Sequence, residues 1–381
     1  MLRGVAVNGG VPNGARGSAD AFASAADSTG GAWWIYRGNG ELPDGETLSD
    51  RLPPPPPWRD FDGGPVVAGP PPEDDAEIRR RLGNPAVTAA FGSPREADMV
   101  NAALLLRRPL IVTGPPGIGK SSLAHRVSRE LGLGRVLRWT ITSRSTLRQG
   151  LYEYDAVGRI QEATARDARA RAAAAEGAHG TADDEVGIGD FIQLGPLGTA
   201  LVPRETPRVL LVDEFDKADT DLANDLLGAF EEGEFAIPEL SRVRSRMPEA
   251  AVHTDDPDGS YTVRNGRIRC RAFPFVVITS NGERTMPPAF LRRCLTLTME
   301  PPAEDELAAI LAAQFATAGD DDERTRMIRD FVVRAQSSGP LPTDQLMNAE
   351  YLRLSTSGLD TDSWNRLLHA LWQRLDGVGS A

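Results

Sequence analysis

Cysteines and long apolar stretches are scarce in this chain. Its 381 residues include only two cysteines, Cys270 and Cys294, and they do not form a CxxC pair. Two thiols cannot build a disulfide framework, so their scarcity indicates a reducing compartment. No apolar run approaches the roughly 20 residues of a membrane-spanning helix, and the N-terminal MLRGVAVNGGVPNGARGSAD lacks the apolar core of a signal peptide. We expect a cytoplasmic protein with no membrane partner.

Basic residues are outnumbered by acidic ones. Forty-two Lys and Arg stand against 54 Asp and Glu, which gives a formal net charge of −12. Such a surface repels phosphate backbones and disfavours non-specific nucleic-acid binding, although a local basic channel stays open as an alternative. The length exceeds one average domain and predicts two or three structural units.

The N-terminal part has an unusual composition. Residues 1 to about 30 are rich in Gly, Ala, Ser and Asn without periodicity, and we expect them to be disordered because they offer little apolar surface to bury. The next segment places aromatic residues around five consecutive prolines. Polyproline stiffens a tether and can serve as a docking ligand, but such dense aromatics favour packing back onto the domain. These aromatic residues are Trp33, Trp34, Tyr36, Trp58 and Phe61.

Short apolar runs rich in β-branched residues recur through the middle of the chain. They lack clean alternation, as expected of strands that are buried on both faces of a parallel sheet. Helical patterns lie between them, and the first, over 94–107, has Ser93 as its cap. The alternation predicts an α/β fold with a parallel five-stranded sheet sandwiched by helices. The five expected strands lie in 109–114, 136–142, 208–214, 273–280 and 295–300.

Two segments interrupt this alternation, and the C-terminal part differs from the rest. Residues 156–187 are prone to form a helix and then become low in complexity, while Asn265-Gly266 between alternating residues predicts a β-hairpin within 238–272. After Pro301 and Pro302 the pattern becomes purely helical. The expected apolar helix faces lie in 307–315, 327–332 and 364–375.

GPPGIGKS, residues 114–121, has the spacing G-x-x-x-x-G-K-[S/T] and lies between a predicted strand and a predicted helix. Because glycine has no Cβ, the glycines of this motif let backbone N–H groups surround a phosphate, and the Lys120 ammonium adds a mobile positive charge. Ser121 supplies a hydroxyl for Mg²⁺. The alternative is a plain glycine-rich turn. The residues expected to bind ATP here are Gly114, Pro115, Pro116, Gly117, Ile118, Gly119, Lys120, Ser121 and Ser122.

Acidic and polar residues end two of the other predicted strands. Asp213 and Glu214 close VLLVDEF, at the edge of the sheet where open α/β folds bind ligands. We expect Asp213 to hold the metal and Glu214 to act as general base on the attacking water, which favours ATP hydrolysis. The alternative is a pair of solvated acids. Asn281 ends FVVITSN and is expected to reach the γ-phosphate, or else forms an ordinary Asn-Gly turn.

Two adjacent arginines, Arg292 and Arg293, precede the last predicted strand. Arginines near a sheet edge are commonly solvated or paired with acids. The functional alternative is an arginine finger that neutralises transition-state charge on ATP bound by a neighbouring subunit.

The order GPPGIGKS, LLVDEFDKAD, ITSN and PPAFLRRC, followed by helices, resembles the AAA+ ATPases and, within them, the MoxR-type group. The resemblance covers roughly residues 85–375. It implies ATP and Mg²⁺ as ligands, a helical lid, and active sites shared between subunits of a ring, usually a hexamer. It also implies a protein client and, by analogy with the group, a von Willebrand A domain partner.

Some residue roles come from this resemblance alone. Arg293 matches the family's finger, but Arg292 stands where the family often has an acid and Cys294 where it has Phe, so either arginine is a candidate. Arg353 is the candidate basic sensor at the start of a lid helix. The predicted domains are a tethering extension (1–75), the AAA+ domain (76–301, with insertions near 156–205 and 235–272) and the lid (302–381).

The resulting hypothesis is an ATP-hydrolysing AAA+ chaperone or remodeller of a protein client. Two alternatives stay open. One is an ATP-dependent switch or scaffold with little turnover, and the other, disfavoured by the net charge, is a nucleic-acid motor.

Overall fold

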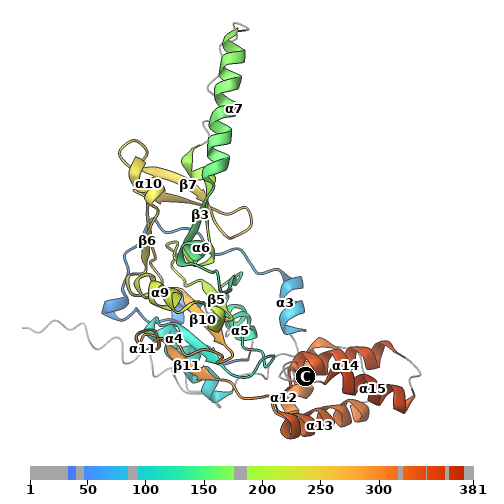
Figure 1. The fold of residues 1–381 in the computed structure, drawn as a ribbon. Helices are drawn as coiled ribbons and strands as arrows, with labels where there is room; N and C mark the ends of the chain where they lie inside the picture. The colour runs from blue at the N-terminus through green and yellow to red at the C-terminus, as the bar shows by residue number, and fades with distance from the viewer. Residues whose placement is uncertain are drawn as a thin grey trace, which may run out of the picture.

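The computed structural model describes residues 33–39, 47–84, 93–175, 187–315, 321–339, 341–356 and 360–372. The disorder expected for residues 1 to about 30 lies outside these ranges. Within them, an α/β body carries a long projecting helix, and a group of C-terminal helices lies beside the body (Figure 1).

A parallel sheet of five strands forms the centre of the body. Its order is β11-β1-β10-β5-β2, and every neighbouring pair runs parallel. All residues of β5 and β10 are buried, as their unbroken apolar character predicts. The predicted five-stranded parallel sheet is therefore confirmed. Its strands are β1 (Leu110–Thr113), β2 (Leu137–Thr140), β5 (Val209–Asp213), β10 (Phe275–Ser280) and β11 (Leu295–Thr298).

Helices cover both faces of this sheet and create two apolar cores. One core joins Val112 and Val277 to Val100 and Leu123 of the flanking helices, and the other surrounds Ile278. The cap predicted for the first helix is present, because the Glu96 backbone N–H donates to Ser93 Oγ over 3.1 Å. The helices of the body are α4 (Pro94–Leu106), α5 (Ser122–Glu130), α6 (Leu147–Leu151), α8 (Pro196–Ala200), α9 (Thr220–Glu232), α10 (Pro238–Val243) and α11 (Pro288–Leu291), with the 3-10 turns η2 (Ile188–Phe191) and η3 (Phe215–Lys217).

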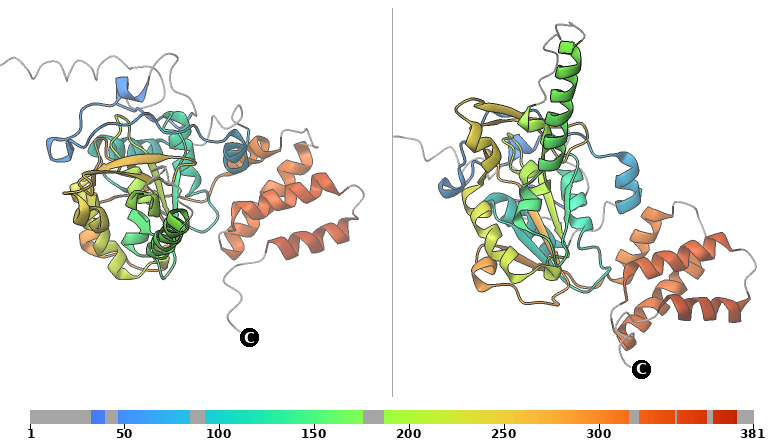
Figure 2. Two further views of the ribbon diagram at one scale, coloured as in Figure 1. Left: turned by 90° about the horizontal axis from the view of Figure 1, so that it is seen from above. Right: turned by 45° about the horizontal axis from the view of Figure 1, so that its top comes forward.

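A second, six-stranded sheet is formed by strands within the second interrupting segment and strands that flank both segments, in the order β3-β4-β7-β8-β9-β6. The predicted hairpin is confirmed, since Asn265 (φ 51°) and Gly266 (φ 71°) both take positive φ between β8 and β9. Helix α7 (Ala156–Ala175) projects away from the body (Figures 1 and 2). The strands are β3 (Tyr152–Tyr154), β4 (Ile192–Leu194), β6 (Glu234–Ala236), β7 (Glu249–His253), β8 (Ser260–Arg264) and β9 (Arg267–Arg269).

The aromatic segment before the body packs onto it. Tyr36 is fully buried and donates through its hydroxyl to Glu96 Oε1 over 2.9 Å, and the backbone N–H groups of Ile35 and Tyr36 donate to Asn101 Oδ1. Phe61 is buried as well, whereas Trp58 is 75% exposed. The predicted packing is therefore confirmed for Tyr36 and Phe61 but not for Trp58. This region forms α2 (Leu48–Arg51), η1 (Pro57–Arg59) and α3 (Asp75–Leu82).

Four helices, α12 (Glu304–Gln314), α13 (Asp321–Ser338), α14 (Thr343–Ser355) and α15 (Thr361–Leu371), follow the last strand and pack around their own apolar core. The sequence predicted three apolar helix faces here, and none of them corresponds to α14. Its buried positions are Thr343, Leu346, Ala349 and Glu350, of which only Leu346 is large and apolar, so the apolar pattern is weak. None of the helices in the described ranges combines the length and apolar character that crossing a bilayer requires.

Candidate nucleotide-binding site

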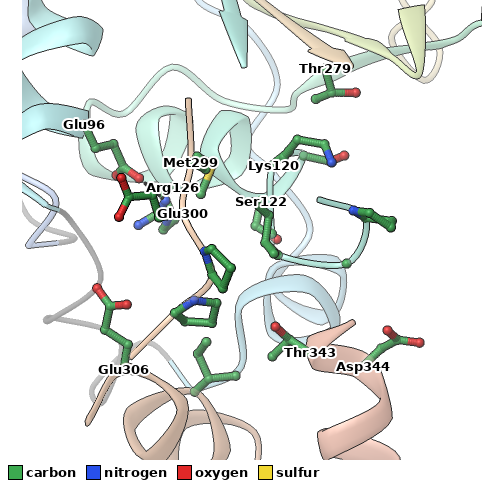
Figure 3. A pocket seen from close by; sticks show the side chains of 18 of the residues that line it. Glu96, Lys120, Ser122, Arg126, Thr279, Met299, Glu300, Glu306, Thr343 and Asp344 are labelled. Carbon is green, nitrogen blue, oxygen red and sulfur yellow. Dashed lines mark hydrogen bonds and ion pairs between the residues drawn. The ribbon is translucent and has the colours of Figure 1, made fainter. Parts of the chain in front are cut away.

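A cleft of about 890 Å³ opens where the carboxyl ends of β1, β5 and β10 meet the C-terminal helices. The body contributes the turn after β1, including Lys120 and Ser122, and the C-terminal helices contribute Thr343 and Asp344 on the opposite side (Figure 3). Of the predicted nucleotide, metal and catalytic residues, the following line this cleft: Pro116, Gly117, Ile118, Gly119, Lys120, Ser121, Ser122, Asp213, Glu214 and Asn281.

Glycines are required in the turn between β1 and α5 for two reasons. Gly114 (φ 149°), Gly117 (φ 75°) and Gly119 (φ 90°) all have positive φ. In addition, a Cβ on Gly117 would lie 2.4 Å from the Pro342 Cβ, and one on Gly114 would lie 2.6 Å from the Met299 carbonyl oxygen. The glycines therefore allow both the backbone conformation of the turn and its close contact with neighbouring segments.

Lys120 is fixed inside the turn by three acceptors. Its Nζ donates to the Gly114 carbonyl over 2.8 Å, to the Pro115 carbonyl over 2.7 Å and to Asn281 Oδ1 over 2.7 Å. Burial lowers the pKa of the Lys120 ammonium, while nearby carboxylates, led by Asp216, act in the opposite direction. Gly114 and Pro115 do not line the cleft, but their carbonyls accept hydrogen bonds from the Lys120 ammonium, which does line it.

Asp213, at the end of β5, accepts hydrogen bonds on both carboxylate oxygens. Ser121 Oγ and Thr279 Oγ1 donate to Oδ1 over 2.7 and 2.8 Å, and Arg138 Nη2 donates to Oδ2 over 2.6 Å. Burial alone would raise the pKa of the Asp213 carboxyl, but these hydrogen bonds outweigh it and hold that pKa below its usual value. Asp213 is therefore an anion held against the Ser121 hydroxyl.

Glu214 has an unusual backbone conformation at the rim of the cleft. Its φ of 61° lies in the left-handed region, which is strained for a residue with a side chain. The Glu214 backbone N–H donates to Thr279 Oγ1 over 2.9 Å, and Lys217 Nζ donates to Glu214 Oε2 over 2.7 Å. Its side chain is 42% exposed, so water can reach the carboxylate.

Asn281 is positioned from its backbone. Its N–H donates to Asp216 Oδ2 over 3.0 Å, and the N–H of Glu283 donates to the same oxygen over 3.3 Å. Asp216 is buried in the turn that follows Glu214. The end of β10 and the end of β5 are thus fastened together beside Lys120.

A family comparison agrees with this geometry. Residues 109–294 match the model of the AAA domain, dynein-related subfamily. This part of the chain is an AAA domain with the AAA+ fold. The matched range begins just before β1 and ends just before β11, so it includes the nucleotide-binding turn, Asp213, Glu214 and both candidate finger arginines.

Structural comparison adds distant likenesses in fold. RuvB of Thermotoga maritima, titled a Holliday junction branch migration motor, is 13% identical at a TM-score of 0.35, and a variant of that protein is 14% identical at 0.37. Each comparison covers 78% of this chain and 70% of the other. Among proteins of curated function, none matches the chain.

The three candidate arginines do not line the AAA+ cleft. Arg292 is exposed, and Arg293 donates through Nε to Glu231 and through Nη1 to the Ala289 carbonyl over 3.2 Å. The expected placement of Arg353 at the start of a lid helix is wrong, because it lies in the last turn of α14. There its guanidinium donates to the buried Glu350 over 2.7 Å. Its role as a sensor stays a prediction without support from this arrangement.

Several cleft residues were missed by sequence reasoning. Thr279 and Arg138 bind Asp213 directly, and Thr343 and Asp344 begin α14 at the opposite wall. Thr279 carried a signal, since it is a hydroxyl inside an otherwise apolar strand. The only sequence signal for Arg138 was its place in a strand with alternating apolar and polar residues, since every second residue of β2 is exposed. Nothing in the sequence indicated that α14 begins at Thr343.

The residues of the site fit a magnesium nucleotide. The described part of the chain contains no cluster of three or more His, Cys, Asp or Glu side chains able to hold a metal by themselves. Mg²⁺ in nucleotide sites needs fewer protein ligands, because it keeps waters and takes oxygens from phosphate. Ser121 Oγ and Asp213 Oδ1, only 2.7 Å apart, are oxygen donors of the required kind.

Proposed function

We propose that this chain binds Mg²⁺-ATP in the cleft and hydrolyses it. The observation that carries the proposal is the meeting of Lys120, Ser121 and Asp213 within one hydrogen-bonded group at the carboxyl edge of the sheet. The turn's backbone N–H groups and the Lys120 ammonium would bind the phosphates, as in other P-loop sites. When bound through Ser121 and Asp213, the metal would neutralise charge on the phosphate oxygens.

Glu214 would take a proton from the attacking water. Its half-exposed carboxylate stands one residue after Asp213 and is turned by the left-handed backbone that the Thr279 hydroxyl supports. Asn281 would orient the water or the γ-phosphate from the neighbouring strand. Its Oδ1 accepts from Lys120 Nζ, and its Nδ2 group would be the donor to a phosphate oxygen or to the water.

The C-terminal helices would act as a lid whose position depends on the nucleotide. The Thr343 backbone N–H donates to the Gly117 carbonyl over 3.1 Å, so α14 touches the phosphate-binding turn directly. Movement of this turn on binding or hydrolysis would therefore reach the lid without an intermediary. We assign the extension to residues 1–75, the AAA+ domain to 76–301 and the lid to 302–381.

We further propose a ring, usually a hexamer, in which Arg293 or Arg292 reaches the nucleotide of the next subunit. Their position outside their own cleft supports such a role. The machine would be of the MoxR type and would remodel a protein client in the cytoplasm, with a von Willebrand A domain protein as its partner. Two free, buried cysteines are compatible with that reducing compartment.

The test is Lys120→Ala, with Arg129→Ala on the following helix α5 as the control, because Arg129 does not line the cleft. We expect Lys120→Ala to lose at least about tenfold in ATP affinity and nearly all phosphate release, while Arg129→Ala keeps both. Wild-type phosphate release by Lys120→Ala would contradict the proposal.

A specific observation favours a second candidate, an ATP-dependent switch with little turnover. Both acids of the site are paired with cations, Asp213 with Arg138 and Glu214 with Lys217. If these pairs persisted with ATP bound, the base would be occupied. Assembly that depends on ATP without phosphate release, measured by sizing and by turnover on the same sample, would favour the switch.

A further inference from the structure

Glu231 lies where an anion is unfavourable unless it is compensated. It is the penultimate residue of α9, and the carboxyl end of a helix carries partial negative charge. Two guanidinium groups reach it. Arg293 donates to Glu231 Oε1 through Nε, and Arg59 Nη2 lies 3.7 Å from Oε2. One carboxylate therefore joins the candidate finger to the segment that precedes the AAA+ domain.

Arg59 is fixed more firmly than an ordinary surface arginine. It is 5% exposed, and its Nη1 donates to the Phe230 carbonyl, one of the last carbonyls of α9. Its guanidinium also lies 5.4 Å from the centre of the Phe273 ring. Arg59 thus caps α9 and stands against Glu231 at the same time, so the proline-rich segment reaches the end of this helix.

The short helix that carries the arginines is seated by the same region. Phe290 on α11 is fully buried and stacks on Phe215 at a ring distance of 5.2 Å. Its ring also lies 6.3 Å from that of Phe230. Phe215 follows Glu214, and Phe230 precedes Glu231. Two buried aromatic contacts therefore fix the start of the Arg293 segment, and Glu231 fixes the side chain itself.

We propose that Glu231, held by Arg59, positions Arg293 to act on the nucleotide of a neighbouring subunit. This inference rests on the proposed function. Arg293 uses Nε for Glu231 and Nη1 for the Ala289 carbonyl, and 29% of its side chain stays exposed. Glu231 is a positioning residue, and Arg59 makes the N-terminal segment part of the finger's support.

The experiment measures turnover, ATP affinity and complementation for Glu231→Gln and Arg293→Ala. We expect Arg293→Ala to lose about a thousandfold in kcat, as for arginine fingers. Glu231→Gln should lose about ten- to a hundredfold in kcat, as expected when a catalytic group is displaced. Both should keep their ATP affinity within about twofold. Glu232→Gln, the same change at an exposed neighbour, is the matched control and should keep wild-type turnover.

Complementation separates positioning from damage to the variant's own cleft. A Glu214→Gln subunit lacks its base but still offers Arg293, so mixing it with either variant should restore turnover. Mixing it with Lys120→Ala should not, because both clefts are then defective. Arg59→Lys, which keeps the charge, should lose less than Arg59→Ala and provides a second variant if Glu231→Gln folds poorly.

The possible results separate the two levels of the proposal. If Arg293→Ala is inactive while Glu231→Gln and Arg59→Ala turn over like the wild type, the positioning role is overturned and ATP hydrolysis is untouched. A defect in Glu231→Gln that Glu214→Gln cannot complement also overturns it. Wild-type turnover by Arg293→Ala removes the finger and this inference together, while the Lys120→Ala result still decides whether the cleft hydrolyses ATP.

Discussion

Removing the Thr279 hydroxyl should weaken both the fold and the catalysis. Thr279 is 2% exposed and makes two buried hydrogen bonds, one to the Asp213 carboxylate over 2.8 Å and one from the Glu214 N–H over 2.9 Å. Thr279→Val keeps nearly the same shape, so no cavity forms. A hydrogen bond to a charged group contributes about 1.5–3 kcal/mol, and a buried N–H left unpaired costs about 1–3 kcal/mol.

From these terms we expect Thr279→Val to lower the free energy of unfolding by about 3 kcal/mol. We also expect kcat to fall by about ten- to a hundredfold, because the strained backbone at Glu214 loses its support and the base is displaced. Urea unfolding without nucleotide and steady-state phosphate release measure the two effects. Thr279→Ser, which keeps the hydroxyl, should retain most of both.

The stability and kcat of Thr279→Val together decide whether the Thr279 hydroxyl has both roles. If Thr279→Val unfolded within about 0.5 kcal/mol of the wild type and also kept its kcat, the buried hydroxyl would matter neither to Asp213 nor to Glu214. Loss of stability with unchanged kcat would refute only the link from the Thr279 hydroxyl to the position of the base.

Three further predictions concern buried groups elsewhere. Arg208→Met should destabilise by about 3 kcal/mol in urea unfolding, because it leaves Asp256 buried with weaker partners; a change below about 1 kcal/mol would contradict this. Burial alone would raise the pKa of Asp256, but the ion pair with Arg208 outweighs burial and lowers that pKa. The loss of unfolding free energy in Asp256→Asn should therefore be complete above about pH 4 and become smaller in more acidic buffer. Burial raises the pKa of Cys270 and of Cys294 to about 12, so native protein at pH 8 should resist iodoacetamide for hours by mass spectrometry, while urea-unfolded protein reacts; rapid native labelling would contradict their burial.

The sheet and its nucleotide-binding edge were accessible from sequence for a physical reason. Strands buried on both faces must be continuously apolar, and a turn that wraps phosphate needs glycine where φ is positive, so both leave local signals. The hairpin at Asn265-Gly266 was accessible for the same reason. Each of these features is dictated by a few neighbouring residues.

Features built from distant residues were not accessible. Arg138 and Asp213 lie 75 positions apart, and Arg59 meets the end of α9 across 171 positions. The misplacement of Arg353 has a related cause. Helix α14 buries Glu350 against Arg324 and Arg353, and Leu346 is the only large apolar residue among its buried positions. Its apolar pattern was therefore weak, and Arg353 proved to be a structural partner of an acid.

Glu214 is the residue on which the proposed ATP turnover depends most directly, and other residues build the phosphate-binding side of the cleft. The most direct test of this role measures bound ATP and released phosphate on one sample of Glu214→Gln. We expect ATP to remain bound with near wild-type affinity while phosphate release falls by about a hundredfold or more, as for loss of a general base. Phosphate release at the wild-type rate would contradict it.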